Sequence, residues 1–307
     1  MEEFANMNEI LKPETLNIPT PSDFSFEECL AHLMRSEQET VHQVTDHSIY
    51  KAIKIDDDEP ILFIIDWKPD ALHVRFPFTT PSAKQKEQTA SFIIEWFDLT
   101  TDLNGFYELA KHDPILSPIV QNHYGLRIMG IPNLFEALTW AIIGQQINLT
   151  FAYTLKKRLV EKYGDYVEYE GKKFYTFPSF EMVASLTTDD LRALQFSTRK
   201  AEYIIGIAQL MQGGKLDKDL LFKLETFEQK HLYLTTIRGI GPWTADYVLM
   251  KSLQESSAFP ISDVGLHNAL KKQLNLDRKP TMDELKELAE KWTGWQAYAT
   301  FYLWRSL

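Results

Sequence analysis

The chain has 307 residues, 44% of them hydrophobic, which is enough to bury a sizeable core in roughly two or three subdomains. No run of eighteen apolar residues occurs, and the acidic start lacks a basic region followed by an apolar stretch. Neither a membrane span nor a secretory signal is therefore predicted, and a cytoplasmic protein is expected. The single cysteine, Cys29, excludes an internal disulfide and a cysteine-rich metal or iron–sulfur centre.

The net charge of -11 is unevenly distributed along the chain. Residues 1–108 contain 8 Lys and Arg against 21 Asp and Glu, whereas residues 109–307 contain 24 against 22. Because phosphate contacts need cations, the acidic first third is expected to face away from any nucleic acid. The near-neutral remainder permits such binding without indicating it.

Two kinds of periodicity divide the chain. In the first third, residues 48–55 and 61–78 are rich in β-formers with alternating polarity, which predicts a small antiparallel sheet. Helical spacing over 24–34 and 84–97 predicts two helices packed on one face of that sheet. The fold class is therefore α+β, with an N-terminal domain over residues 1–108.

From Leu109 onward helical patterns dominate, so residues 109–307 are predicted to form an all-α domain. A short strand pair is predicted near 166–174. The predicted helices cover 109–123, 133–145, 149–163, 180–186, 188–194, 198–212, 217–222, 226–236, 242–253, 264–273, 281–291 and 295–305.

The most informative segment runs from Leu234 to Tyr247. Gly239 and Gly241 flank one residue, Pro242 follows, and apolar helical spacing continues on both sides. Glycine accepts positive φ and close approach of a partner, and proline suits the first turn of a helix. The pattern predicts a helix, a tight hairpin and a second helix whose N-terminal amides form an anion site. An ordinary αα-hairpin without a ligand is the alternative.

Three segments together resemble the helix-hairpin-helix DNA glycosylases. They are Ile237–Tyr247 (IRGIGPWTADY) with Phe259–Asp263 (FPISD), Leu134–Gln146 (LFEALTWAIIGQQ) and Trp292–Trp304 (WTGWQAYATFYLW). The chain is most similar to the 3-methyladenine DNA glycosylase II branch, strongly from about residue 130 and weakly before it. The resemblance implies two helical subdomains in the all-α domain, with the active-site cleft between them.

Asp263 precedes a predicted helix, and its position alone makes it a conventional N-cap. The resemblance implies that it is also the catalytic aspartate. Cleavage of an N-glycosidic bond develops positive charge on the sugar, which a nearby carboxylate stabilises. The same carboxylate can orient or deprotonate the attacking water, and the amides at the helix end favour its ionised, electrostatic role.

Trp243 stands where family members that also cleave the DNA backbone carry a lysine, which forms a Schiff base with the sugar. The resemblance therefore implies a monofunctional enzyme that uses water and leaves an abasic site. Packing within the hairpin is the simpler role for this tryptophan, and both roles can coexist.

The resemblance also implies binding roles for further residues. An aromatic pocket attracts cationic N-alkylated purines by stacking and cation–π contact. Glutamine stands at the position of the wedge that fills the gap left by the flipped nucleotide, where close relatives commonly carry leucine. The implied base pocket is Trp243, Tyr247, Trp304, Gln145 and Leu30; the wedge is Gln146; the phosphate site is Gly239, Gly241 and Thr244; and the carbonyls of Thr235, Ile237 and Ile240 match a monovalent-cation site, Na⁺ or K⁺.

The resulting hypothesis is a monofunctional DNA glycosylase of base excision repair. It flips out and excises alkylated purines such as 3-methyladenine and 7-methylguanine from double-stranded DNA, as a monomer and without a cofactor. An 8-oxoguanine-type glycosylase is one alternative, which the missing lysine at position 243 disfavours. A non-catalytic module that uses the hairpin to grip phosphates is another, and Asp263 beside three pocket aromatics speaks against it.

Overall fold

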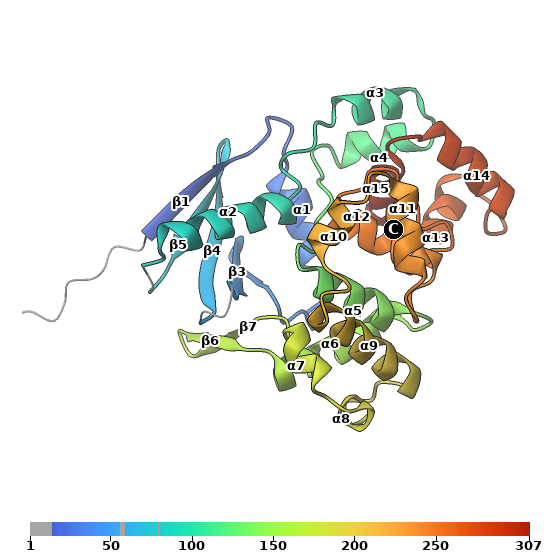
Figure 1. The fold of residues 1–307 in the computed structure, drawn as a ribbon. Helices are drawn as coiled ribbons and strands as arrows, with labels where there is room; N and C mark the ends of the chain where they lie inside the picture. The colour runs from blue at the N-terminus through green and yellow to red at the C-terminus, as the bar shows by residue number, and fades with distance from the viewer. Residues whose placement is uncertain (1–13, 56–58, 79) are drawn as a thin grey trace, which may run out of the picture.

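The structure, a computed structural model, describes residues 14–55, 59–78 and 80–307. Its first part is a five-stranded antiparallel sheet in the order β1-β5-β4-β3-β2, which lies to the left of the helices in Figure 1. The strands are β1 (Glu14–Pro19), β2 (Gln43–Thr45), β3 (Ser48–Ile53), β4 (Ile61–Lys68) and β5 (Ala71–Phe76). The predicted sheet is confirmed. The two outer strands β1 and β2 were missed, because β1 carries a proline at its end and β2 has only three residues.

Both faces of the sheet are covered. On one face lie α1 (Phe26–Leu33) and α2 (Ala83–Trp96), and the Phe63 ring of β4 meets the Phe92 ring of α2 edge-on at 6.4 Å. On the other face the hairpin of β6 (Tyr166–Tyr169) and β7 (Lys172–Tyr175) packs through Phe174, which stacks on Tyr50 at 5.4 Å. The predicted strand pair therefore exists, and it ties the helical part to the sheet.

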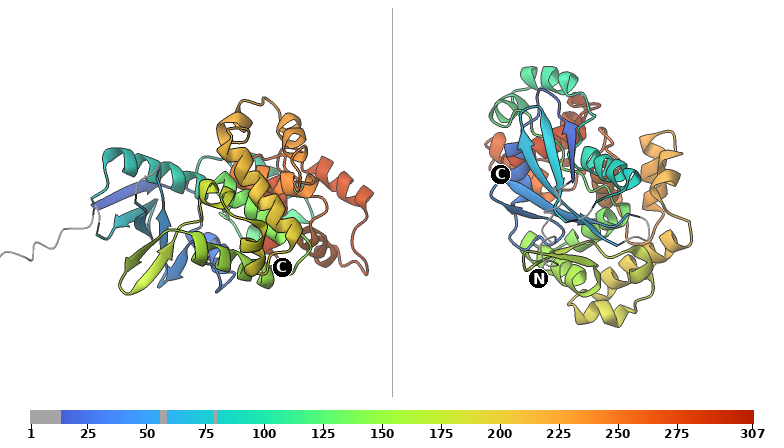
Figure 2. Two further views of the ribbon diagram at one scale, coloured as in Figure 1. Left: turned by 60° about the horizontal axis from the view of Figure 1, so that its bottom comes forward. Right: turned by 90° about the vertical axis from the view of Figure 1, so that its left-hand side faces the viewer.

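The helical part forms two groups (Figures 1 and 2). In Figure 1, α5, α6, α7, α8 and α9 lie below, and α3, α4, α13, α14 and α15 lie above. The bounds are α3 (Asn104–His112), α4 (Leu116–Asn122), α5 (Leu134–Gly144), α6 (Leu149–Tyr163), α7 (Phe180–Ala184), α8 (Thr188–Ala193), α9 (Thr198–Gln212), α10 (Lys218–Phe222), α11 (Phe227–Thr235), α12 (Pro242–Ser252), α13 (Val264–Gln273), α14 (Met282–Lys291) and α15 (Gln296–Arg305). Ten consecutive residues of α5 are buried, as expected of a helix that is apolar all round.

The single helix predicted over 109–123 is wrong. Helix α3 ends at His112 and α4 begins at Leu116. Proline disfavours helical backbone at the residue before it, which here is Asp113. The Asp113 carboxylate then accepts the N–H groups of Ile115 and Leu116 at 2.8 and 2.9 Å, and so starts the second helix. Within the described ranges, no helix has the length and apolar character needed to cross a membrane.

A buried ion-pair network joins the sheet part to the helices. Lys156 Nζ of α6 lies 3.0 Å from Glu39, which follows α1, and 3.1 Å from Glu136 of α5. These side chains are 7, 9 and 11% exposed, respectively. Burial by itself raises the pKa of Glu39, but the Lys156 ammonium outweighs it and lowers that pKa to about 2. Folding therefore favours the ionised form of Glu39.

Glu39 is expected to make unfolding depend on pH in an acidic window. Its pKa falls from the ordinary 4.5 to about 2 in the folded chain, so its stabilisation is complete above about pH 4.5 and is lost as the pH falls to about 2. The loss is on the order of 3 kcal/mol. Urea unfolding of Glu39→Gln across this range should show a flatter profile than wild type. Glu37→Gln, at an exposed glutamate two residues earlier, is the control and should keep the wild-type slope. Equal slopes for Glu39→Gln and wild type would contradict the assignment.

Candidate active site

The Asp263 carboxylate is fixed by three N–H donors from three helices. Its Oδ1 accepts the backbone N–H of Leu266 in α13 at 2.7 Å and the indole Nε1–H of Trp304 in α15 at 2.7 Å. Its Oδ2 accepts the indole Nε1–H of Trp243 in α12 at 3.2 Å. The predicted N-cap is confirmed. Because two indole N–H groups also bind it, the carboxylate is part of an aromatic cluster as well as a helix cap.

The aromatic residues expected around Asp263 lie together. Trp243 stacks on Tyr247 with ring centroids 5.6 Å apart, and Tyr247 lies 6.1 Å from Trp304. Trp243 and Trp304 are half-buried, whereas Tyr247 is 7% exposed and forms the inner side of the group. The Tyr247 hydroxyl accepts a hydrogen bond from Nε1 of Trp140 at 3.0 Å. Trp140 on α5 was not predicted, because its position in an apolar run is that of any core residue.

Gly265 was also missed, although the site depends on it. A Cβ at this position would lie 2.9 Å from Asp263 Oδ1 and 3.2 Å from two atoms of the Trp304 indole. The absence of a side chain therefore lets Trp304 approach the carboxylate. A glycine in the first turn of a helix, two residues after an aspartate, is the signal that sequence reasoning could have used.

The hairpin between α11 and α12 has the predicted form. Gly239 has φ 98°, and a Cβ there would lie 2.4 Å from the Tyr203 ring, so both backbone and packing require glycine. Gly241 is the N-cap of α12, and Pro242 is at its first turn. Both residues are exposed, which leaves this helix end open to a ligand. That a DNA phosphate binds there stays a prediction.

Gln145 braces the hairpin. Its Nε2 donates to the carbonyl of Gly239 and to the Thr244 hydroxyl, both at 3.0 Å. Thr244 is 2% exposed, so its hydroxyl faces Gln145 and not the surface. The contacts of Gln145 and Thr244 in this structure are thus with other residues of the protein. Base binding by Gln145 and phosphate binding by Thr244 stay predictions.

Gln146 and Leu30 lie in different surroundings. Gln146 is exposed in the turn between α5 and α6, with φ 54°, a left-handed conformation that is uncommon for glutamine. This placement is compatible with the wedge role, which stays a prediction. Leu30 is 2% exposed and belongs to the core, so in this structure it offers no surface to a base.

The carbonyls proposed for a cation lie at the end of α11 and in the hairpin. The Ile237 carbonyl accepts the N–H of Ile240 at 3.0 Å, which leaves it one further lone pair. Thr235 and Ile240 supply the other two carbonyls of the proposed set. Across residues 14–55, 59–78 and 80–307, no group of three or more His, Cys, Asp or Glu side chains is arranged to bind a metal ion.

Comparison with known proteins agrees with this architecture. A family described as HhH-GPD superfamily base excision DNA repair protein matches residues 139–294, and the 8-oxoguanine DNA glycosylase N-terminal domain matches residues 21–138. DNA-3-methyladenine glycosylase of Bacillus subtilis (strain 168) is 44% identical over 296 residues, covering 96% of this chain and 97% of that protein.

Two solved structures show the same fold. The 3-methyladenine DNA glycosylase from Archaeoglobus fulgidus has a TM-score of 0.81 at 26% identity, covering 94% of this chain and 97% of that one. The 8-oxoguanine glycosylase/lyase from Clostridium acetobutylicum has a TM-score of 0.74 at 20% identity, covering 96% of this chain and 98% of that one. At that identity the second likeness concerns the fold alone.

A helical hairpin with an open helix end thus lies next to an aspartate that is held by two tryptophans. The chain belongs to the HhH-GPD superfamily of base excision DNA repair proteins and, within it, to the 3-methyladenine DNA glycosylase II branch.

Gly265→Ala is expected to slow base release by roughly tenfold or more, because the added methyl pushes Trp304 and Asp263 apart. The measurement is single-turnover release from alkylated duplex DNA. Gly206→Ala in α9, where a Cβ meets nothing within 4 Å, is the matched control and should keep the wild-type rate. Wild-type turnover by Gly265→Ala would show that the close contact is dispensable.

Proposed function

We propose that this protein is a monofunctional DNA glycosylase that excises alkylated purines, including 3-methyladenine and 7-methylguanine, and leaves an abasic site. The observation that carries the proposal is the Asp263 carboxylate held by Trp243 and Trp304. The tryptophan at position 243 supplies an N–H to the carboxylate where a lyase would need an amine nucleophile. The name of the B. subtilis relative, DNA-3-methyladenine glycosylase, supports the substrate class.

Asp263 acts as a fixed negative charge opposite the sugar. As the C1′–N bond breaks, positive charge develops on the sugar ring, and a carboxylate already in place stabilises it without reorganising. A carboxylate offers about four acceptor sites. Oδ1 receives two N–H groups and Oδ2 receives one, so Oδ2 keeps a site for the attacking water.

The aromatic group binds the flipped base. Trp243 and Trp304 contact the carboxylate through their indole N–H groups, and the Tyr247 ring lies next to both indoles. Such rings attract the cationic form of an N-alkylated purine, at ~0.5–2 kcal/mol for each contact. These contacts, with Gln146 as the wedge, offset the few kcal/mol that flipping costs.

The hairpin grips the DNA backbone next to the lesion. The exposed N-terminus of α12 at Gly241 offers amides and the positive end of the helix dipole to a phosphate. A monovalent cation on the carbonyls of Thr235, Ile237 and Ile240 would add positive charge at the same place. One protein molecule acts on one lesion, so a monomer is expected.

Asp263→Asn is expected to lower the single-turnover rate of base release by roughly 100-fold or more, the magnitude typical of losing a key electrostatic group. Release of free 3-methyladenine and 7-methylguanine from methylated duplex DNA is the measurement. Asp277→Asn, at an exposed aspartate past the end of α13, should match wild type. Duplex binding without base release by wild type would favour the non-catalytic module.

Borohydride is expected to trap no covalent protein–DNA complex, because Trp243 cannot form a Schiff base. Strands should break at the abasic site only after alkali treatment. The same assay with 8-oxoguanine opposite cytosine tests the alternative function. A trapped complex, or cleavage without alkali, would replace the proposed function by that of a glycosylase/lyase.

A further inference from the structure

Trp304, one of the two tryptophans that bind the Asp263 carboxylate, lies in the last turn of α15. The next residue, Arg305, ends that helix, and Ser306 is its C-cap. The last carbonyl groups of a helix have no partner within it, and helix ends open more readily than helix centres. The position of the Trp304 indole relative to Asp263 therefore depends on the side chains that anchor this turn.

A carboxylate of the sheet part provides one anchor. Glu28 of α1 accepts the Nε–H of Arg305 at 2.8 Å, and the same oxygen, Oε2, lies 3.1 Å from Nδ1 of His123 at the end of α4. The side chains of Glu28, Arg305 and His123 are 20, 32 and 20% exposed, so water screens this contact less than it screens a surface ion pair. One oxygen atom thus joins α1 to two helices of the helical part.

A second contact lies one turn away on both helices. The ring of His32, four residues after Glu28, lies 4.8 Å from the ring of Phe301, four residues before Arg305. Because residues four apart lie on the same face of a helix, α1 and α15 meet along one face and run antiparallel. Phe301 in turn lies edge-on to the Trp304 ring, with centroids 6.2 Å apart. Both contacts of α1 therefore lead to the turn that carries Trp304.

The opposite side of that turn is anchored by the helix that begins at Asp263. Lys272 of α13 donates through Nζ to the Ser306 carbonyl at 2.7 Å, and Gln273 donates through Nε2 to the Ser306 hydroxyl at 3.1 Å. Loss of the Glu28 contact would leave this second anchor in place. The end of α15 would then keep one anchor and lose the other.

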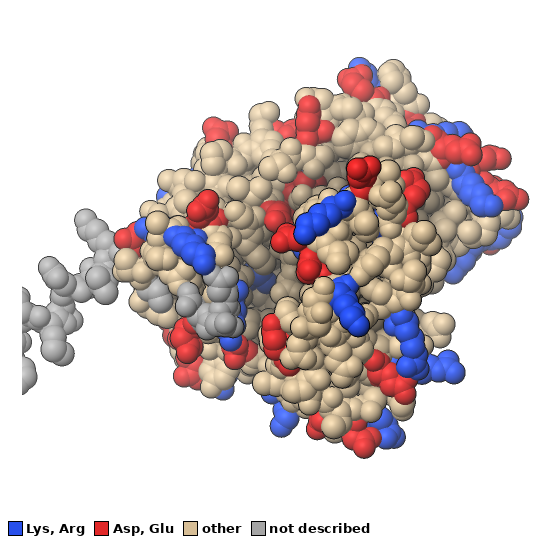
Figure 3. Space-filling view, viewed as in Figure 1, with Lys and Arg blue, Asp and Glu red and all other residues tan. Residues whose placement is uncertain are grey.

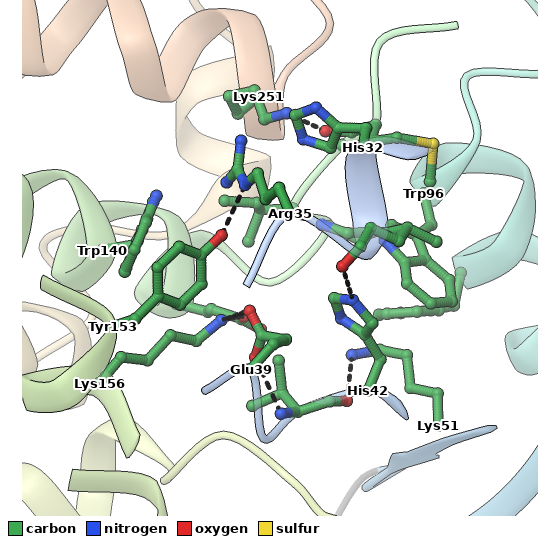
Figure 4. A pocket seen from close by; sticks show the side chains of 18 residues that line it. His32, Arg35, Glu39, His42, Lys51, Trp96, Trp140, Tyr153, Lys156 and Lys251 are labelled. Atoms are coloured by element: carbon green, nitrogen blue, oxygen red, sulfur yellow. Dashed lines mark hydrogen bonds and ion pairs between the residues drawn. The ribbon is translucent and has the colours of Figure 1, made fainter. Parts of the chain in front are cut away.

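Other links between the sheet part and the helices lie at the cavity that separates them (Figure 4). His32 and Arg35 line this cavity, and Arg35 donates through Nε to the Tyr153 hydroxyl at 2.5 Å. Among the described residues that line the cavity, neither Asp263 nor Trp304 occurs. The contact of Arg35 with Tyr153 therefore does not hold the partners of the carboxylate, whereas the contact of α1 with α15 does.

An ion pair elsewhere between the same two parts provides a comparison. Glu95 of α2 pairs with Lys218 of α10, and the two side chains are 43 and 22% exposed. In the described part of the chain, neither side chain hydrogen-bonds to Asp263 or Trp304. Removing Glu95 thus breaks an ion pair between the two parts and leaves the surroundings of Asp263 intact.

We propose that Glu28 is a positioning residue for base release, which acts through Arg305 to keep the Trp304 indole on the Asp263 carboxylate. The inference rests on the proposed function. Trp304 supplies one of the two N–H groups on Oδ1, and a misplacement of about 1 Å can cost roughly 100-fold in rate. A residue of the sheet part thus determines the geometry of a site that lies in the helices.

The test compares base release with DNA binding. Single-turnover release of 7-methylguanine from methylated duplex DNA is measured for each variant, next to its affinity for a duplex that contains an abasic-site analogue. Glu28→Ala and Arg305→Ala should each slow release by roughly tenfold, because they remove the two ends of one contact. Their duplex affinity should stay within about twofold of wild type. Glu28→Gln keeps an acceptor oxygen and should release the base at an intermediate rate.

Two further variants are controls. His123→Ala leaves the contact between Arg305 and Glu28 in place and should release the base within about twofold of the wild-type rate. Glu95→Ala is the matched control, since it removes a glutamate that joins the same two parts, and it should keep the wild-type rate.

A double-mutant cycle distinguishes positioning from a general loss of stability. Trp304→Phe removes the indole N–H, so adding Glu28→Ala to it should slow release by no more than about twofold further, because two changes to one contact chain are not additive. Additive losses, an equal loss of duplex affinity, or wild-type release by Glu28→Ala would each overturn the inference and leave the proposed function standing. If wild type itself releases no 7-methylguanine, the proposed function fails, and this inference fails with it.

Discussion

The Asp263 carboxylate is the point on which the site depends, because helices from three stretches of the chain converge on it. A half-buried carboxylate needs hydrogen-bond donors to offset its lost hydration. Here the first turn of α13 supplies one, and the indoles of Trp243 and Trp304 supply the others. Those indole contacts also set the angle of both rings. The hydrogen bonds to the carboxylate therefore also orient the two tryptophans of the aromatic group.

The second constraint is the brace between the α5 end and the hairpin. Gln145 hydrogen-bonds to the Gly239 carbonyl, and the next residue, Gln146, stands exposed in a left-handed conformation. Gly239 in turn lies against the Tyr203 ring of α9. The turn that carries Gln146 and the loop that carries the open helix end consequently form one unit. The proposed phosphate site and the proposed wedge are therefore held at a fixed separation from each other.

The sheet part has two electrostatic aspects. Residues 1–108 are strongly acidic as a whole, yet this segment contributes Arg35 and Lys51 to the cavity between the sheet part and the helices. On the face in Figure 3, acidic and basic side chains are interspersed. Arg35 and Lys51 are therefore basic residues within an acidic segment. The ion pairs of Lys156 with Glu39 and Glu136 hold the segment that follows α1 against the helices. Net charge said little about this junction, because it averages over surface and interior.

Sequence alone determined the local elements and the motif. Most helices from α5 onward agree with their predicted ranges to within about two residues, because capping residues and apolar periodicity are local signals. The glycine–proline hairpin and the N-cap position of Asp263 are local signals too, whereas the catalytic role of Asp263 was implied only by the family resemblance. Only the tertiary structure decided that Trp140 supports Tyr247, that Gly265 admits Trp304, and that Arg35 hydrogen-bonds to Tyr153. Each of these contacts joins residues that are far apart in the chain. Periodicity and spacing are local, so they do not indicate which side chains meet between helices.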